Sequence, residues 1–128
     1  MAATAEPEMI EREAVMATSA ELAAYLQGEL GQQLTAYLTG LRDAKMVGRW
    51  AGGKSAPREA ANLRLRYAFR IARMLIDAYG ADTAKAWLVG ANTRLDDEAP
   101  ASVLRHAQSP EDLRRLVPAA RAFVGAAG

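Results

Sequence analysis

Cysteine is absent from this 128-residue chain. Its absence excludes disulfide scaffolds and cysteine-ligated metal sites, and it agrees with a reducing compartment. The first residues, MAATAEPEMIEREA, contain neither a basic segment nor an apolar run, so they do not read as a secretory signal. No apolar stretch reaches the length that a membrane span requires. We therefore expect a cytoplasmic protein with no membrane partner.

Candidate catalytic and metal-binding groups are also scarce. His106 is the only histidine and has no evident partner for acid–base catalysis. The acids in LDDEAP, residues 95–100, are adjacent rather than spaced as in a calcium loop. GGKS at 52–55 lacks the upstream glycine of a phosphate-binding loop. We expect no catalytic residue, no metal site and no cofactor, and hence a protein that is not an enzyme.

Helix-forming residues dominate what remains. Alanine and leucine are abundant, β-branched residues are scattered, and no alternation of period two is long enough for a strand. The strongest helix is predicted at 59–79, where apolar residues recur every three or four positions up to Gly80. Leu65, Phe69 and Met74 lie off this stripe, which predicts burial on more than one side. The fold class is therefore all-α.

The remaining helices are placed by capping residues, glycines and prolines. We expect them at 9–27, 32–39, 44–51, 83–89, 101–107 and 110–124, with residues 1–8 disordered. Asp43, Asp82 and Ser109 are expected to cap the helices that follow them. Pro118 inside the last helix predicts a kink. The expected organisation is an acidic N-terminal arm or helix (1–30), a helix-turn-helix-like domain (31–80) and a small C-terminal helical domain (81–128), joined by the long helix.

The net charge of +1 hides an uneven distribution. Residues 1–41 carry six acids and one base, whereas residues 42–73 carry nine bases and two acids. A basic centre of this kind indicates a polyanion partner. A solvated helix face explains it equally well.

The stretch VGRWAGGKSAPR, residues 47–58, lies within this basic centre. A short helix at 32–39, a tight turn at 40–42 and a second helix at 44–51 form the order of a helix-turn-helix motif. In that motif the second helix enters the major groove. Lys45 and Arg49 are four residues apart and are expected on one face of this helix, with Ala44, Val47 and Trp50 on the opposite, inward side. We therefore predict DNA contacts from five basic residues: Arg42, Lys45, Arg49, Lys54 and Arg58. The alternative is a structural turn between two core helices.

Two longer patterns resemble one protein family. LT…GLRD…VGRWAGGKSAPR, over 34–58, resembles the Xre-type helix-turn-helix, although Ala51 stands where that family commonly has an acid. AWLVGANTRLDDEAPASVLRHA…LRRLVPAARAFVGAAG is similar to the toxin-binding domain of the Xre/MbcA/ParS antitoxins. The family often has a glycine shortly before the proline, where this chain has 97–99.

The resemblance implies a type II antitoxin that pairs with a RES-domain toxin, an enzyme that degrades NAD. Such antitoxins block the toxin's active site and repress their own operon as dimers. Carried onto this chain, the toxin-binding residues are Trp87, Asn92, Arg94, Arg114, Arg121, Phe123, Val124 and Gly125. We expect Phe123, Val124 and a flexible tail at 125–128 to enter or cover the toxin pocket.

Each of these assignments has a structural alternative. Trp87 suits the core as well as an interface, and Phe123 and Val124 suit a helix end packed on the protein itself. The arginines of the last helix suit a solvated face. At the level of function, the alternative is a stand-alone Xre-like transcription regulator whose C-terminal half only dimerises. The expected partners are a RES-domain toxin, operator DNA, and a second copy or a larger toxin–antitoxin assembly.

Overall fold

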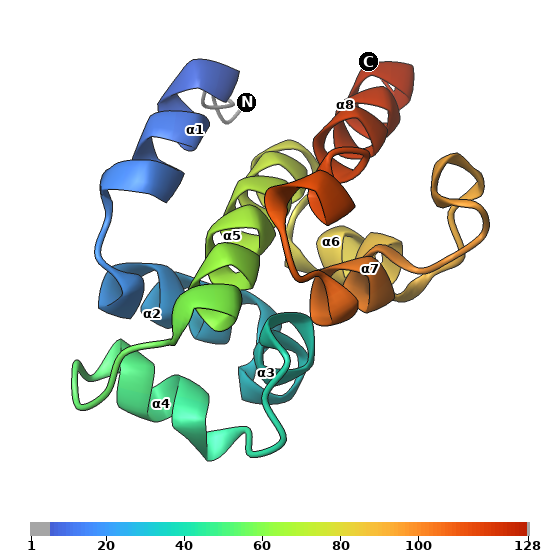
Figure 1. Cartoon of the computed structure of the whole chain (residues 1–128). Coiled ribbons are helices and arrows are strands. Elements are labelled where there is room, and N and C mark those ends of the chain that lie inside the picture. Colours follow the sequence, from blue (N-terminus) through green and yellow to red (C-terminus); the bar gives the residue numbers. More distant parts are fainter. Residues whose placement is uncertain (1–5, 128) are drawn as a thin grey trace.

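Helices are the only regular secondary structure of the described residues, which confirms the predicted all-α class. The computed structural model describes the backbone of residues 6–127 and the side chains of residues 6–125. Within that range the α-helices are α1 (Pro7–Met16), α2 (Ser19–Leu30), α3 (Gln32–Thr39), α4 (Lys45–Ala51), α5 (Glu59–Tyr79), α6 (Ala81–Val89), α7 (Pro100–His106) and α8 (Leu116–Ala127). Two 3-10 helices, η1 (Thr93–Leu95) and η2 (Pro110–Leu113), complete the order shown in Figure 1.

Helix α5 runs through the middle of the molecule, with its predicted bounds confirmed (Figure 1). It contacts α1, α2, α3, α6, α7 and α8. Leu65, Phe69 and Met74, the residues off its main stripe, are all buried, so the expectation of burial on several sides is confirmed. None of the helices within 6–127 is both long and apolar enough to cross a bilayer.

A single hydrophobic core holds the elements together. It includes Ile10 and Leu26 from the N-terminal segment, Trp50 from the middle segment, and Leu104 and Leu116 from the C-terminal segment. The boundaries at residues 30 and 80 stay predictions, but the three segments share this core. Surfaces on different segments are therefore held in fixed relation by the same packing.

The single helix predicted at 9–27 is wrong, because the chain forms two helices there. Thr18 has extended backbone and caps α2, its hydroxyl accepting from the Glu21 N–H at 3.1 Å. The Glu21 carboxylate accepts in return from the Thr18 N–H at 2.9 Å. This capping box satisfies two N–H groups that a helix end leaves without partners. The T-x-x-E spacing was readable in the sequence and was missed.

Other predicted boundaries also shift. Helix α1 begins at Pro7, so the disorder predicted at 1–8 is wrong for residues 7 and 8, and residues 1–5 lie outside the described part. Helix α2 continues to Leu30 rather than ending at 27. Asp82 was expected to cap the next helix, but α6 already begins at Ala81, directly after Gly80.

The end of the chain corrects two further expectations. SPEDL forms the 3-10 helix η2 instead of opening the last helix, and Ser109 makes no side-chain capping bond. Helix α8 begins only at Leu116, so Pro118 falls in its first turn. Proline removes no intrahelical hydrogen bond in that position, and the physical basis for the predicted kink is gone.

Helix α1 is fastened to α5 by charged groups. The Arg66 guanidinium donates to the carbonyls of Ala14 (2.7 Å), Val15 (3.3 Å) and Ala17 (3.0 Å), at the end of α1. Arg73 pairs with Glu13 at 2.6 Å. Because the last carbonyls of a helix have no partner within it, the guanidinium satisfies groups that would otherwise need water.

Replacing Thr18 by alanine should remove the capping box and lower the free energy of unfolding by about 1 kcal/mol. Urea denaturation followed by circular dichroism measures this loss. Thr93→Ala is the matched control, since Thr93 is exposed and its side chain forms no hydrogen bond within the described residues. Equal stability of Thr18→Ala and the native chain would contradict a stabilising role for this cap.

Candidate nucleic-acid and partner interfaces

The turn between α3 and α4 is built on Gly40. This residue has left-handed backbone, with φ of 84°, and ends α3 as predicted. The Leu41 N–H donates to the Ala36 carbonyl at 2.9 Å, which closes the turn. Asp43 Oδ1 then accepts from the Lys45 N–H at 3.0 Å, the capping role expected for Asp43. The helix that follows begins at Lys45, one residue after the predicted start.

Helix α4 has an inner side and an outer side. Val47 and Trp50 are buried against the core, whereas Lys45 and Arg49 are exposed on the other side. Helices α2 and α3 both contact α4. The predicted sidedness of α4 is therefore confirmed, and Trp50 is a core residue.

Two arginines from distant elements hold the turn. Arg64 of α5 donates to the Thr39 carbonyl at 3.3 Å and to the Ala107 carbonyl at 2.9 Å. Its guanidinium occupies the space that a side chain at Gly40 would need. Arg105 of α7 donates to the Tyr37 carbonyl at 2.9 Å and lies over the Tyr37 ring. Sequence reasoning missed both arginines, because no local pattern marks a contact across so many positions.

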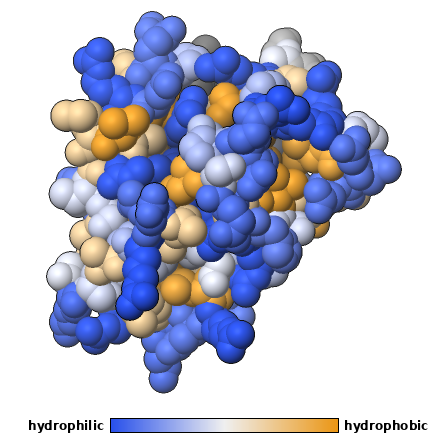
Figure 2. Space-filling model, in the orientation of Figure 1, coloured by the Kyte–Doolittle hydropathy of each residue, from blue (hydrophilic) through white to orange (hydrophobic). Residues whose placement is uncertain are grey.

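The basic centre divides into two groups with different surroundings. The five predicted DNA-contact residues are exposed, and none of their side chains forms an ion pair or hydrogen bond within the described chain. In contrast, the arginines of α5 bind internal partners. Hydrophilic side chains cover most of the lower edge of the molecule in Figure 2, where α4 lies. The exposed group alone retains its full capacity for an external anion.

The five exposed residues do not share one cavity. Arg42 and Lys45 line a shallow hollow of about 650 Å³ with Gln32 and Gln33 of α3. Arg58 lines a separate hollow of about 430 Å³ beside Trp50. The arrangement is an open basic surface along α4 and its flanks rather than a pocket for a small ligand.

The predicted toxin-binding residues gather partly in one groove. Trp87, Asn92, Arg94 and Phe123 line a hollow of about 390 Å³ between α6, η1 and α8. Arg114 lines an adjoining hollow with Arg94 and Pro118. Three predicted residues, Arg121, Val124 and Gly125, line neither hollow. We call the two hollows together the α8 groove.

Aromatic contacts fix the end of α8 against the rest of the protein. The Phe123 ring meets Tyr79 edge-on at 5.4 Å and lies 6.2 Å from Trp87, yet Phe123 is still 37% exposed. The Tyr79 hydroxyl donates to the Val124 carbonyl at 3.0 Å. Trp87 is half-buried, so it contributes to the core and also reaches the groove. An aromatic anchor of this kind is typical of protein interfaces.

The flexible tail expected at 125–128 is wrong for 125–127, because α8 is helical through Ala127. Gly128 lies outside the described residues. Backbone hydrogen bonding continues past Val124, and this keeps the helix regular. A helix end, rather than an extended tail, would meet a partner at this position.

The loop that borders the α8 groove has unusual backbone. Asp96 and Asp97 are consecutive residues in the left-handed region, with φ of 56° and 67°. Asn92 Oδ1 accepts from the Arg94 N–H at 2.9 Å, and Arg115 donates to Asp96 at 2.8 Å. The hydrogen bond from Arg115 lowers the pKa of Asp96. Backbone strain of this kind concentrates at functional sites.

No group of three or more His, Asp or Glu side chains among the described residues could hold a metal ion. His106 is exposed, and its Nδ1 lies 2.9 Å from the Ser102 carbonyl, one turn earlier in α7.

Comparisons with protein-family models, with curated proteins and with solved structures returned no significant match to this chain. The resemblance to the Xre/MbcA/ParS antitoxins accordingly depends on the residues of this sequence alone.

Replacing Asp97 by glycine should release left-handed strain and raise the free energy of unfolding by about 0.5–1 kcal/mol. Chemical denaturation measures the gain. Glu98→Gly is the matched control: its backbone φ is not positive, so glycine there adds only unfolded-state entropy and should destabilise. A loss of stability in Asp97→Gly as large as in Glu98→Gly would contradict the strain.

Proposed function

We propose that this protein is the antitoxin of a type II toxin–antitoxin pair. In this proposal it binds operator DNA through α4 and its flanks, and it binds and neutralises a RES-domain toxin through the α8 groove. It acts in the cytoplasm as a dimer and represses its own operon. It performs no catalysis and needs no cofactor.

The observation that carries the DNA half of the proposal is the unpaired state of the exposed basic residues. Lys45 and Arg49 project from the outer side of α4, while Val47 and Trp50 anchor its inner side. A rigid helix with a free basic side suits a groove of DNA, and Lys54 and Arg58 suit the flanking phosphates.

The toxin half of the proposal is supported by the α8 groove. Its floor contains exposed aromatic surface from Trp87 and Phe123, and Arg94 stands at its rim without an ion pair in the described chain. An aromatic anchor within a polar rim is the usual composition of a protein interface. The strained loop beside it agrees with a functional role.

The two surfaces lie at different ends of the molecule. Helix α4 is at the bottom of Figure 1, and α8 is at the top right. One chain therefore has room for DNA and toxin at the same time. This separation suits a repressor that remains on its operator while it holds the toxin.

Replacing Arg49 by alanine should weaken binding to promoter DNA of the protein's own gene at least tenfold, with no change in fold. Fluorescence anisotropy of labelled DNA measures the affinity. Arg121→Ala is the matched control, since Arg121 is also an exposed arginine but lies on α8. Native affinity in Arg49→Ala would exclude α4 as the DNA-binding helix.

Salt dependence gives a second check of the same surface. Each phosphate contact releases counterions, so Lys54→Ala should lower the slope of log K against log salt by about 0.9. An unchanged slope would show that Lys54 does not contact a DNA phosphate.

Replacing Arg94 by glutamate should weaken binding of the RES-domain toxin at least tenfold, because it reverses a charge at the rim of the groove. Co-expression measures growth rescue, and calorimetry measures the affinity. Arg42→Glu is the control, since it reverses an exposed charge on the DNA side. Equal loss of toxin binding in both variants would contradict the α8 groove as the toxin site.

Capture of the tagged protein from its own cells separates antitoxin from stand-alone regulator. A stoichiometric partner whose NAD-degrading activity appears after denaturation, separation and refolding supports the antitoxin. Recovery of salt-labile DNA with no protein partner supports the regulator instead.

A further inference from the structure

Helix α1 carries an apolar surface that neither proposed interface uses. Met9, Val15 and Met16 are 64%, 67% and 76% exposed, and they account for three of the six large hydrophobic residues exposed in the described chain. Apolar patches appear at the upper left of Figure 2, over α1, among polar side chains. Concentrated exposure of this kind on one ten-residue helix indicates an interface.

The outward direction of these residues is fixed by the other side of α1. Ile10 and Ala14 are buried against the core, and Arg66 and Arg73 bind the end and the flank of the helix. Positions 9, 12 and 16 have the spacing of one helical face, opposite the buried residues. Met9, Arg12 and Met16 therefore form a ridge on a helix that is held in place.

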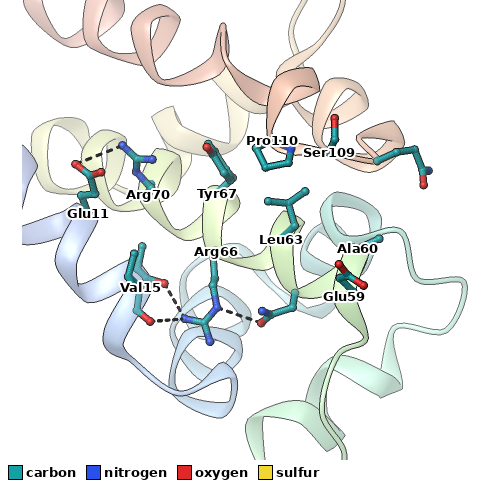
Figure 3. Close-up of a pocket in the computed structure, with 13 residues that line it drawn as sticks. Glu11, Val15, Glu59, Ala60, Leu63, Arg66, Tyr67, Arg70, Ser109 and Pro110 are labelled. Carbon is teal, nitrogen blue, oxygen red and sulfur yellow. Dashed lines mark hydrogen bonds and ion pairs between the residues drawn. The ribbon is translucent and has the colours of Figure 1, made fainter.

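A hollow lies along the same helix, on the side that carries Val15. It has a volume of about 880 Å³ and runs between α1, α5 and η2 (Figure 3). Val15, Leu63, Tyr67 and Pro110 give it apolar walls, and Glu59 stands at its end. We call this hollow the α1 groove. Val15 belongs both to its wall and to the exposed surface of α1.

We propose that the ridge of α1 docks into the α1 groove of a second copy of this chain. The inference rests on the proposed function only in expecting a dimer. Both surfaces lie along α1 of one molecule. Under a two-fold axis, the ridge of each copy can therefore enter the α1 groove of the other copy. Methionine, arginine and tyrosine, the residues available here, are enriched in interfaces.

Charge favours a second copy over other occupants. Within the described residues, Arg12 on the ridge and Glu59 at the groove have no ion pair. The two arginines that line the groove are already engaged, Arg66 by backbone carbonyls and Asn62, and Arg70 by Glu11 at 3.9 Å. In the proposed dimer, Arg12 of each chain therefore pairs with Glu59 of the other chain.

The position of α1 allows it to pair without covering the two proposed interfaces. In Figure 1, α1 forms the upper left of the molecule, away from α4 at the bottom and α8 at the right. Pairing through α1 leaves both α4 helices and both α8 grooves uncovered. A dimer of this kind can present two α4 helices to two half-sites of DNA.

Sedimentation equilibrium of the full chain, without DNA or toxin, tests the proposal. The native chain should reach twice its 13.7 kDa at micromolar concentration. Met16→Glu should weaken the dimer at least tenfold, because it places a charge within the apolar contact. Val89→Glu is the matched control, since Val89 is 60% exposed on α6 and lies outside the α1 groove. Circular dichroism verifies that both variants keep the native helix content.

A charge exchange tests the groove independently of the methionines. Arg12→Glu should weaken the dimer several-fold, and adding Glu59→Arg should restore it. A monomeric native chain, an unchanged dimer in Met16→Glu, equal weakening in Val89→Glu or a failure of this rescue would each overturn the proposal. Toxin binding that is lost in Met16→Glu, with a monomeric native chain, would assign α1 to the toxin instead.

These outcomes are distinct from those of the proposed function. A dimer that passes both tests but binds neither DNA nor toxin would count against the antitoxin alone. A monomer that binds both would count against the α1 pairing and the proposed dimer, but not against the binding of DNA and toxin.

Discussion

The arrangement of the other helices depends on the hydrogen bonds that the arginines of α5 donate to helix-end carbonyls. Carbonyls at a helix end have no partner within their own helix. Arg66 supplies donors to the end of α1, and Arg64 supplies them to the ends of α3 and α7. One central helix thus satisfies the end carbonyls of three neighbouring helices, while its apolar residues contribute to the shared core. Arg105 adds a link from α7 to the α3–α4 turn.

This use of arginine changes the meaning of the basic centre. A cluster of positive charge in a sequence indicates a polyanion partner or a solvated face. Here part of the cluster, the arginines of α5, instead binds groups within the protein. The α5 arginines serve internal carbonyls and acids, and the acidic α1 supplies two of those acids, Glu11 and Glu13. Within the basic centre, the bases that remain free lie on α4 and its flanks. Internal pairing therefore restricts the proposed DNA contact to one side of the molecule.

The accuracy of sequence reasoning differed between elements for identifiable reasons. The bounds of α5 and the end of α3 at Gly40 were predicted correctly, because a long apolar period and a left-handed glycine are strong local signals. The break at Thr18 was missed although its capping box is local. The 3-10 form of η2 and the start of α8 at Leu116 were not predicted, since packing decides between a 3-10 turn and an α-helical turn there.

The sequence by itself determined the helical class, the central helix, the two-sided character of α4 and the absence of cysteine chemistry. These follow from composition and from periodicity, which are local properties. Only the tertiary structure decided which arginines are free, which predicted residues line the α8 groove, and that a ridge and a groove both lie along α1. Such facts depend on contacts between residues far apart in the chain, and local sequence does not specify which distant group will satisfy a given donor or cover a given side chain.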